Sequence, residues 1–408
     1  MEECLRFWLR GCAVFGIYVI PIQEHYTAPH WQRLSRKKGG RQLAWTEEKA
    51  TRLTYLLQRL YLAMLAVTVC VLYLHGLYAR EIEHGFVLTW LVATLVYTSQ
   101  MLTHLSIFMA ALWKREQHES FLQLLQQIEV SLKLRLKCNT RQSALLHSLR
   151  LLLFSLILLS VVGICVFTVV SVWLNDIGYY WHAAWTIVTL RVRILQLLIY
   201  ARILRHYLDC VCVKLRQVVA CRTSPASQLL DINYERFESL EFLLAIKENY
   251  TLIFKAVQLF NDFAGWSLFG IISSYMLDFT CHLYWSLLGL DGYGSPYTYL
   301  VGMPAALPFS VIVCHLCYVC GNCKQLGAII TDLVSKLTTV RSTPALKRYS
   351  CVVYQFSTQL QLQRIEVTAQ HFFVLDLRLI MSISTAIATN LVIMIQFLKS
   401  ENSESSGA

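Results

Sequence analysis

Residues 379–397 read LIMSISTAIATNLVIMIQF, and this stretch decides the fold of the chain. It carries no charge and has about the length that an α-helix needs to cross a bilayer, at ~1.5 Å of rise per residue. One helical face, with i, i+4, i+8 and i+11 spacing, carries Thr385, Thr389, Ile393 and Gln396. Lipid cannot satisfy polar groups, so this polar stripe is expected to face protein or water. It either packs against neighbouring helices or lines a pore.

The end of this stretch resembles the signature of the insect gustatory receptor family. That signature closes the last membrane helix with Thr-Tyr, five hydrophobic residues and Gln-Phe. Here Thr389 is followed by Asn390, by the apolar residues 391–395 and by Gln396-Phe397, so the sequence departs from the signature at Asn390. Two upstream segments also look like the family's approach to this helix: 356–360 and 372–376.

The resemblance implies a tetrameric, ligand-gated, nonselective cation channel in the plasma membrane. Its partners would be a small-molecule tastant, identical or related receptor subunits and the lipid bilayer. The last helices of the subunits would surround a shared pore lined by Thr385, Thr389 and Ile393. Gln396 and Phe397 would form the constriction near the outer end of that pore, because rings of amide or bulky apolar side chains narrow a channel.

The composition is typical of a membrane protein. Hydrophobic residues make up 56% of the 408 residues and charged residues only 15%, whereas a water-soluble domain carries about a quarter charged residues. The net charge is +11, but the basic residues alternate with apolar spans and form no single patch, so no nucleic-acid partner is expected. The 14 cysteines are scattered, and no structural disulfide is expected.

No metal site or cofactor is expected either. Four thiols recur at every third residue, at Cys314, Cys317, Cys320 and Cys323. Steps of three residues on a helix drift by about 60° each, so these thiols fan around the helix and do not converge on one metal ion. They are expected to pack against other helices.

We expect an all-α membrane protein with seven spanning helices and an intracellular bundle of loop helices. The expected spans are approximately 60–78, 86–113, 151–174, 179–204, 256–288, 297–319 and 379–398. They divide the chain into a cytoplasmic N-terminal segment 1–57, six spans with their loops 58–320, a cytoplasmic link 321–378, a pore-lining helix 379–398 and an extracellular tail 399–408. The link is expected to be helical from 324 to 370, and the tail from Ser400 is expected to be disordered. Pro304 and Pro308 are expected to kink the sixth span.

Charge asymmetry predicts the orientation of these spans. Of the 36 Lys and Arg residues, 31 lie in the segments 1–57, 114–150, 201–255 and 321–378. The opposite set of loops contains only Arg80 and Lys399. Because positive residues stay on the cytoplasmic side, the N-terminus is predicted to be inside and the C-terminus outside. A G-protein-coupled receptor has the reverse orientation.

A ligand pocket is expected in the outer halves of spans two to six, which are rich in aromatic and polar groups. The candidates are Trp90, Tyr97, Trp185, Arg191, Tyr275, Asp278, His282 and Tyr297. Arg191 and Asp278 both lie roughly 15–17 Å below the outer surface, so they are placed to pair. His282 lies one turn from Asp278 on the same face. Such a pair is either structural or part of the ligand site.

The sequence contains no nucleophile elbow, phosphate loop, zincin motif or pair of catalytic carboxylates, so no enzyme is expected. Two other functions stay open. One is an odorant receptor of the same superfamily, which has the same architecture. The other is a secondary transporter, for which an internal repeat and matching broken helices would be expected, and neither is found.

The orientation is directly testable. An epitope tag placed before Met1 should stain only after the cells are permeabilised, because the basic segment 1–57 is predicted to stay inside. Staining of the tag on intact cells would show that the orientation is reversed.

Overall fold

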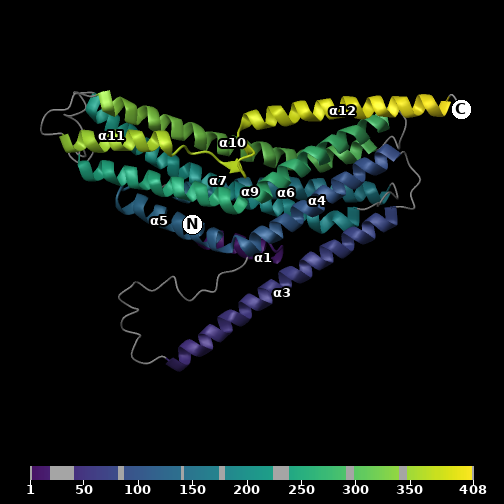
Figure 1. Ribbon diagram of the computed structural model, residues 1–408, viewed down its shortest axis with the longest axis horizontal. Coiled ribbons are helices and arrows are strands. Elements are labelled where there is room, and N and C mark those ends of the chain that lie inside the picture. The colour runs from purple at the N-terminus through teal and green to yellow at the C-terminus, as the bar shows by residue number, and fades with distance from the viewer. Residues whose placement is uncertain are drawn as a thin grey trace.

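The computed structural model describes residues 2–18, 41–80, 87–138, 142–173, 180–223, 239–290, 298–339 and 347–406. These residues form an elongated bundle of long helices (Figure 1). The helices are α1 (Glu2–Val14), α3 (Arg41–Arg80), α4 (Val87–Trp113), α5 (Arg115–Leu134), α6 (Gln142–Trp173), α7 (Tyr180–Thr223), α9 (Leu240–Leu290), α10 (Thr298–Thr339), α11 (Lys347–Leu362) and α12 (Leu377–Ser406). Between α11 and α12 lie the strands β1 (Thr368–Ala369) and β2 (Phe373–Val374).

Each expected span, apart from single end residues, lies inside one of seven long helices. The helices extend well beyond the expected ends of the spans: α7, α9 and α10 contain 44, 51 and 42 residues. From the expected span 179–204, α7 continues without a break to Thr223. A helix of 51 residues is ~75 Å long, so much of α9 must project beyond a bilayer about 30 Å thick.

One expectation about a helix end was wrong. The tail expected to be disordered from Ser400 continues α12 to Ser406, because no Gly or Pro interrupts residues 398–406. The kink expected at Pro304 and Pro308 stays a prediction, since both residues lie inside α10 and the helix continues through them.

Five helices within the described residues contain a segment long and apolar enough to cross a membrane. The segments are Tyr55–Tyr78, Thr94–Trp113, Leu145–Val166, Ala306–Thr338 and Leu377–Phe397. Neither α7 nor α9 is among them, because both carry polar residues along their length, such as Arg191 and Arg193 in α7. The crossing of the membrane by seven helices therefore stays a prediction.

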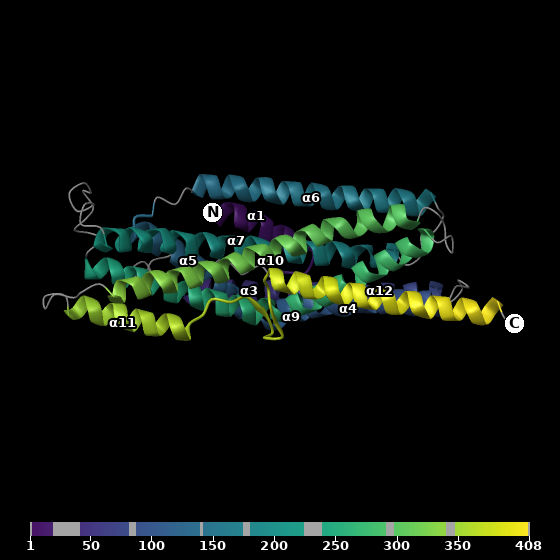
Figure 2. The same ribbon diagram turned by 90° about the horizontal axis from the view of Figure 1, so that it is seen from above.

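The core lies around α9, which contacts α4, α5, α7, α10, α11 and α12. Large side chains such as Tyr200, Tyr207 and Phe260 are almost completely buried there. Figure 2 shows α6 along one side of the bundle and α12 along the other. By contrast, α3 and α6 expose many apolar side chains, including Leu60, Val67 and Phe154, as helices that face lipid do.

A small hairpin replaces part of the expected helical link from 324 to 370. The antiparallel strands pair Thr368 with Val374 and Ala369 with Phe373. Residues 370–372 connect the strands, and the Phe372 amide donates to the Ala369 carbonyl at 3.0 Å. The two central residues of this turn, Gln370 and His371, have positive φ angles of 47° and 61°, as a type I′ turn requires. The sequence did not reveal this turn, because neither Gln370 nor His371 is a typical turn former.

The hairpin is bound to the middle of α9 and so positions the start of α12. The amide of Asn261 donates to the carbonyl of Glu366 at 2.9 Å, and its oxygen accepts from the Thr368 amide at 3.1 Å. One turn later, Gly265 leaves room for the turn: a Cβ there would lie 3.0 Å from the backbone nitrogen of Gln370.

Gly265 therefore predicts a packing defect. Gly265→Ala should lower the free energy of unfolding by about 1–3 kcal/mol, because the added methyl group overpacks the contact with the turn. Gly327→Ala is the matched control, since its Cβ would meet Ile365 at an ordinary 3.5 Å. The control should be neutral or stabilising by up to about 1 kcal/mol. Thermal unfolding of purified protein measures both, and equal melting temperatures would contradict the prediction.

Candidate functional site

The expected pore helix begins at a well-defined N-cap. The carboxylate of Asp376 accepts from the backbone amides of Arg378 at 2.9 Å and Leu379 at 3.3 Å, as N-cap residues do. Lys324 of α10 lies 3.9 Å from the same carboxylate and 3.1 Å from that of Glu366. The inner end of α12 is thus held by both the hairpin and α10.

The two faces of α12 differ sharply in exposure. The face toward the bundle carries apolar side chains that are buried or half-buried at i, i+4, i+8 and i+11 spacing: Ile383, Ile387, Leu391 and Met394. The opposite face carries four of the predicted pore residues, and all four are exposed: Thr385, Thr389, Ile393 and Gln396. Phe397 is also exposed, but it lies ~100° around the helix from Gln396 and so off this face. The sequence predicted the common face of the four residues, and the structure adds that this face points away from the chain's own core.

The threonines of this stripe already donate within the helix. The Thr385 hydroxyl donates to the Met381 carbonyl and the Thr389 hydroxyl to the Thr385 carbonyl, both at 3.0 Å. Their oxygens still present acceptor lone pairs outward. An outward row of acceptors is compatible with a hydrated cation path and is poorly suited to contact with lipid.

The structure brings Asp278 and His282 of α9 together with α4. The Gln100 side-chain amide donates to the Asp278 carboxylate at 3.1 Å, and His282 Nε2 lies 3.6 Å from the same oxygen. One turn before Asp278 on α9, the Ser274 hydroxyl forms a 2.7 Å hydrogen bond with the Thr103 hydroxyl and donates to the Ser99 carbonyl at 3.0 Å. A ladder of polar contacts therefore joins α4 to α9.

Arg191 makes a different contact. Its guanidinium donates to the carbonyl of Ser160 on α6 at 3.2 Å, while the hydrogen bond of Asp278 comes from α4. The two charges at similar depth are thus engaged with different helices. The ion pair between Arg191 and Asp278, which their similar depth suggested, is not one of these two contacts.

The aromatic candidates divide between several helix contacts. Tyr97 is buried and donates to the Leu72 carbonyl of α3 at 3.1 Å. Trp185 of α7 stacks on Phe15 at 5.0 Å, and Tyr275 packs edge-on against Phe309 of α10 at 5.6 Å. The side chain of Trp90 and all of Tyr297 lie outside the described residues.

Sequence reasoning missed three buried polar atoms that lie near these candidates. Gln100 Oε1, His104 Nε2 and Trp185 Nε1 have no hydrogen-bond partner among the described residues. His104 is one turn from Gln100, and its Nδ1 contacts the Thr186 hydroxyl at 2.9 Å. Buried polar atoms of this kind favour a bound polar molecule, since leaving them unsatisfied is costly. The signal in the sequence was Gln100 and His104 at i, i+4 spacing in an otherwise apolar span.

A second polar network, also missed, fixes the centre of the bundle. Arg193 is 2% exposed, donates to Gln196 at 2.6 Å and contacts the Ser267 hydroxyl of α9 at 3.1 Å. Gln196 continues to the Tyr200 hydroxyl, which pairs with His118 of α5 at 2.7 Å. Burial lowers the pKa of the His118 imidazole well below its usual range, and the charge of Arg193 adds to this effect.

An apolar cluster connects the polar ladder with α12. Cys281 of α9 packs with Val92 and Val96 of α4, and Trp285 and Met394 close this cluster. Cys281 lies between Asp278 and His282 on α9, while Met394 is three residues before Phe397 on α12. The residues next to the polar ladder therefore pack continuously, through this cluster, against α12.

Comparison with known proteins is consistent with these features. A family model described as 7tm chemosensory receptor matches residues 5–401. Gustatory receptor 39b of Drosophila melanogaster is 28% identical over 225 residues, which cover 54% of this chain and 59% of that protein. Gustatory receptor 23a of the same organism is 34% identical over 151 residues, covering 36% and 39% of the two chains. The matched regions thus span between two fifths and three fifths of these two relatives.

The fold is similar to that of a solved receptor. The insect olfactory receptor OR5 from Machilis hrabei, in complex with eugenol, aligns with a TM-score of 0.63 over 97% of this chain and 99% of that chain. The sequence identity is 14%, so the similarity concerns the fold.

The contact between Gln100 and Asp278 is testable by a double-mutant cycle. Gln100→Leu and Asp278→Ala, singly and together, should show a coupling energy of about 1–2 kcal/mol, the upper range for hydrogen bonds in membrane proteins. Pairing Gln100→Leu with Asp262→Ala provides the control, because Asp262 is an exposed carboxylate on the same helix. Thermal unfolding measures both cycles, and equal coupling in the two would contradict the assignment.

Proposed function

The chain belongs to the 7tm chemosensory receptor family, and from that premise we propose that it is a subunit of a ligand-gated, nonselective cation channel that detects a small-molecule tastant. The channel resides in the plasma membrane, with seven spans, a cytoplasmic N-terminus and an extracellular C-terminus. Identical or related subunits complete it as a tetramer.

One observation carries this proposal: the polar stripe of α12 lies on its exposed face. A spanning helix that turns Thr385, Thr389 and Gln396 away from its own bundle favours water or another protein there. Hydrocarbon satisfies neither the Gln396 amide nor the acceptor lone pairs of the two threonine hydroxyls. Symmetric packing of several copies around an axis supplies both. The stripes then line a central aqueous path, and Gln396 with Phe397 forms its narrowest ring.

The ligand site lies where α4, α7 and α9 meet. Gln100, His104 and Trp185 present buried donors and acceptors without protein partners, and Asp278 supplies a charge. Tyr97, Tyr275 and His282 belong to the surrounding helix contacts. This combination suits a small organic molecule with hydrogen-bonding groups. Its binding shifts α9 against α4, and the cluster around Cys281 and Met394 passes the shift to α12.

One alternative is supported by a specific observation. The similarity in fold to an olfactory receptor favours an odorant receptor of the same architecture. The two functions differ in whether the ligand arrives in solution or from air. Expression in cells, with recording of the current evoked by panels of water-soluble and volatile compounds, tests the channel and separates these ligand classes. Ligand uptake without current would indicate a transporter.

The role of Asp278 is separately testable in that assay. Asp278→Ala should shift the dose–response to higher concentrations by about tenfold or more, because a charge-assisted contact in a partly buried site is lost. Asp262→Ala, on the exposed surface of the same helix, should leave the response unchanged. An unchanged dose–response for Asp278→Ala, at normal surface expression, would remove Asp278 from the site.

The gate is testable in the same cells. Phe397→Ala should produce current without ligand, because the apolar ring that closes the pore is removed. Phe372→Ala is the matched control, since Phe372 is exposed to a similar extent, 67% against 63%, but precedes the pore helix. In Gln396→Cys, an external thiol reagent should react faster when agonist is present. Silent Phe397→Ala channels and an agonist-independent rate of thiol modification would move the gate to Ile393 or Thr389.

A further inference from the structure

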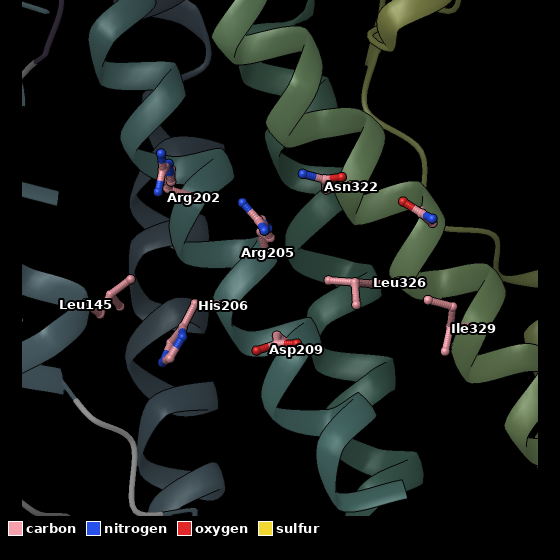
Figure 3. Close-up of a pocket in the computed structure, with 9 residues that line it drawn as sticks. Leu145, Arg202, Arg205, His206, Asp209, Asn322, Leu326 and Ile329 are labelled. Atoms are coloured by element: carbon pink, nitrogen blue, oxygen red, sulfur yellow. The ribbon is translucent and has the colours of Figure 1, made fainter. Parts of the chain in front are cut away.

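An open cleft lies between α6, α7 and α10, apart from the polar ladder and the pore helix (Figure 3). Its volume is about 420 Å³. Figure 3 shows Leu145 of α6 on one side and Asn322 and Leu326 of α10 on the other, with Arg202 and Arg205 of α7 between them. The proposed channel assigns no role to this cleft.

The wall that α7 contributes is positively charged. Arg202, Arg205 and His206 line it, with Asp209 as the acidic member of the lining. Among the described residues, neither arginine forms an ion pair with a carboxylate. Arg202 instead shares a 2.7 Å hydrogen bond with His315, and the Arg205 guanidinium lies 5.9 Å from the centre of the Tyr318 ring. The lining therefore keeps a net positive charge, because it holds two arginines and only one carboxylate, that of Asp209.

Two buried donors in the lining also await an acceptor. Arg202 Nε and Asn322 Nδ2 have no hydrogen-bond partner within the described part of the chain. Both are N–H donors, so a ligand that satisfies them must present acceptor oxygens. Two guanidinium groups and an amide around one cleft are the groups that recognise phosphate, because the planar guanidinium matches its oxygens in pairs.

The cleft lies at the predicted cytoplasmic border of the expected spans. Arg205 directly follows the expected span 179–204, Asn322 lies three residues after the expected span 297–319, and Leu145 lies six residues before the expected span 151–174. In the orientation proposed above, this is the cytoplasmic leaflet, where anionic lipids concentrate. Basic pockets between membrane helices on that side are suited to phosphorylated headgroups.

We propose that this cleft binds a phosphate group and that its source is the headgroup of an anionic lipid of the inner leaflet. Arg202 and Arg205 neutralise the phosphate, and the Asn322 amide donates to one of its oxygens. The open side of the cleft admits the headgroup, while the apolar flanks at Leu145 and Leu326 border the acyl chains. The occupant bridges α6, α7 and α10. The assignment to the inner leaflet rests on the proposed orientation. The recognition of a phosphate group by Arg202, Arg205 and Asn322 is independent of that orientation.

The test uses the full chain in nanodiscs of phosphatidylcholine, with or without phosphatidylinositol bisphosphate. The phosphoinositide should raise the melting temperature, because a ligand that binds only the folded state stabilises it. Arg205→Gln should weaken the apparent affinity by about tenfold, the loss expected for one hydrogen bond to a charged group. Arg150→Gln is the matched control, because Arg150 is an exposed arginine of α6 outside the lining of the cleft. The affinity of this variant for the phosphoinositide should stay unchanged.

A second variant covers the case in which Arg205→Gln fails to fold. Asn322→Asp leaves both arginines in place but introduces a carboxylate, so it should keep the melting temperature measured without phosphoinositide and lose the stabilisation.

A parallel titration with inorganic phosphate, in detergent, identifies the source of the phosphate group. Stabilisation by the lipid alone supports the headgroup. Equal stabilisation by both overturns the lipid assignment and leaves soluble phosphate as the ligand. The phosphate site is overturned if neither the phosphoinositide nor inorganic phosphate raises the melting temperature. It is also overturned if both variants keep the full stabilisation. The epitope tag before Met1 tests the orientation, whereas the detergent titration tests phosphate binding whatever the orientation is. A reversed orientation and a failed phosphate site therefore give different results.

Discussion

The structure depends on one constraint: hydrocarbon cannot satisfy a polar group. The constraint explains why α7 and α9, the helices richest in buried polar contacts, lie inside the bundle. Arg193 is the strongest case, because its guanidinium is 2% exposed and is held by Gln196 and Ser267. An unsatisfied charge at that depth would cost several kcal/mol. The helices α3 and α6, which expose apolar side chains, take the positions that face lipid.

The same constraint gives meaning to the exceptions. The polar stripe of α12 is exposed, and so it requires partners that a single chain does not supply. The unsatisfied atoms of Gln100, His104 and Trp185 favour a polar molecule between α4 and α7. The two arginines of the cleft between α6, α7 and α10 favour an anion. The partner subunits, the tastant and the lipid headgroup that we propose would each satisfy one of these three groups of polar atoms.

The helix α9 connects these places. It carries Asp278 of the polar ladder, packs through Cys281 toward Met394 of α12, and binds the hairpin through Asn261. The hairpin in turn sets the N-cap of α12 at Asp376. The helix α12 is therefore attached to α9 near both ends of its apolar segment 379–397. Such a double attachment lets a small movement of one long helix tilt another without breaking the bundle.

The sequence by itself determined the features that are local to one helix. The apolar length of residues 379–397 and the common face of Thr385, Thr389, Ile393 and Gln396 follow from a period of 3.6 residues, and the structure confirms that face. Contacts between distant segments were decided only by the tertiary structure. Depth suggested Arg191 as the partner of Asp278, whereas the fold brings Gln100 of α4 to that carboxylate. The hairpin turn and the cleft between α6, α7 and α10 were likewise unreadable, because helical periodicity fixes which face a residue occupies but not which helix it meets.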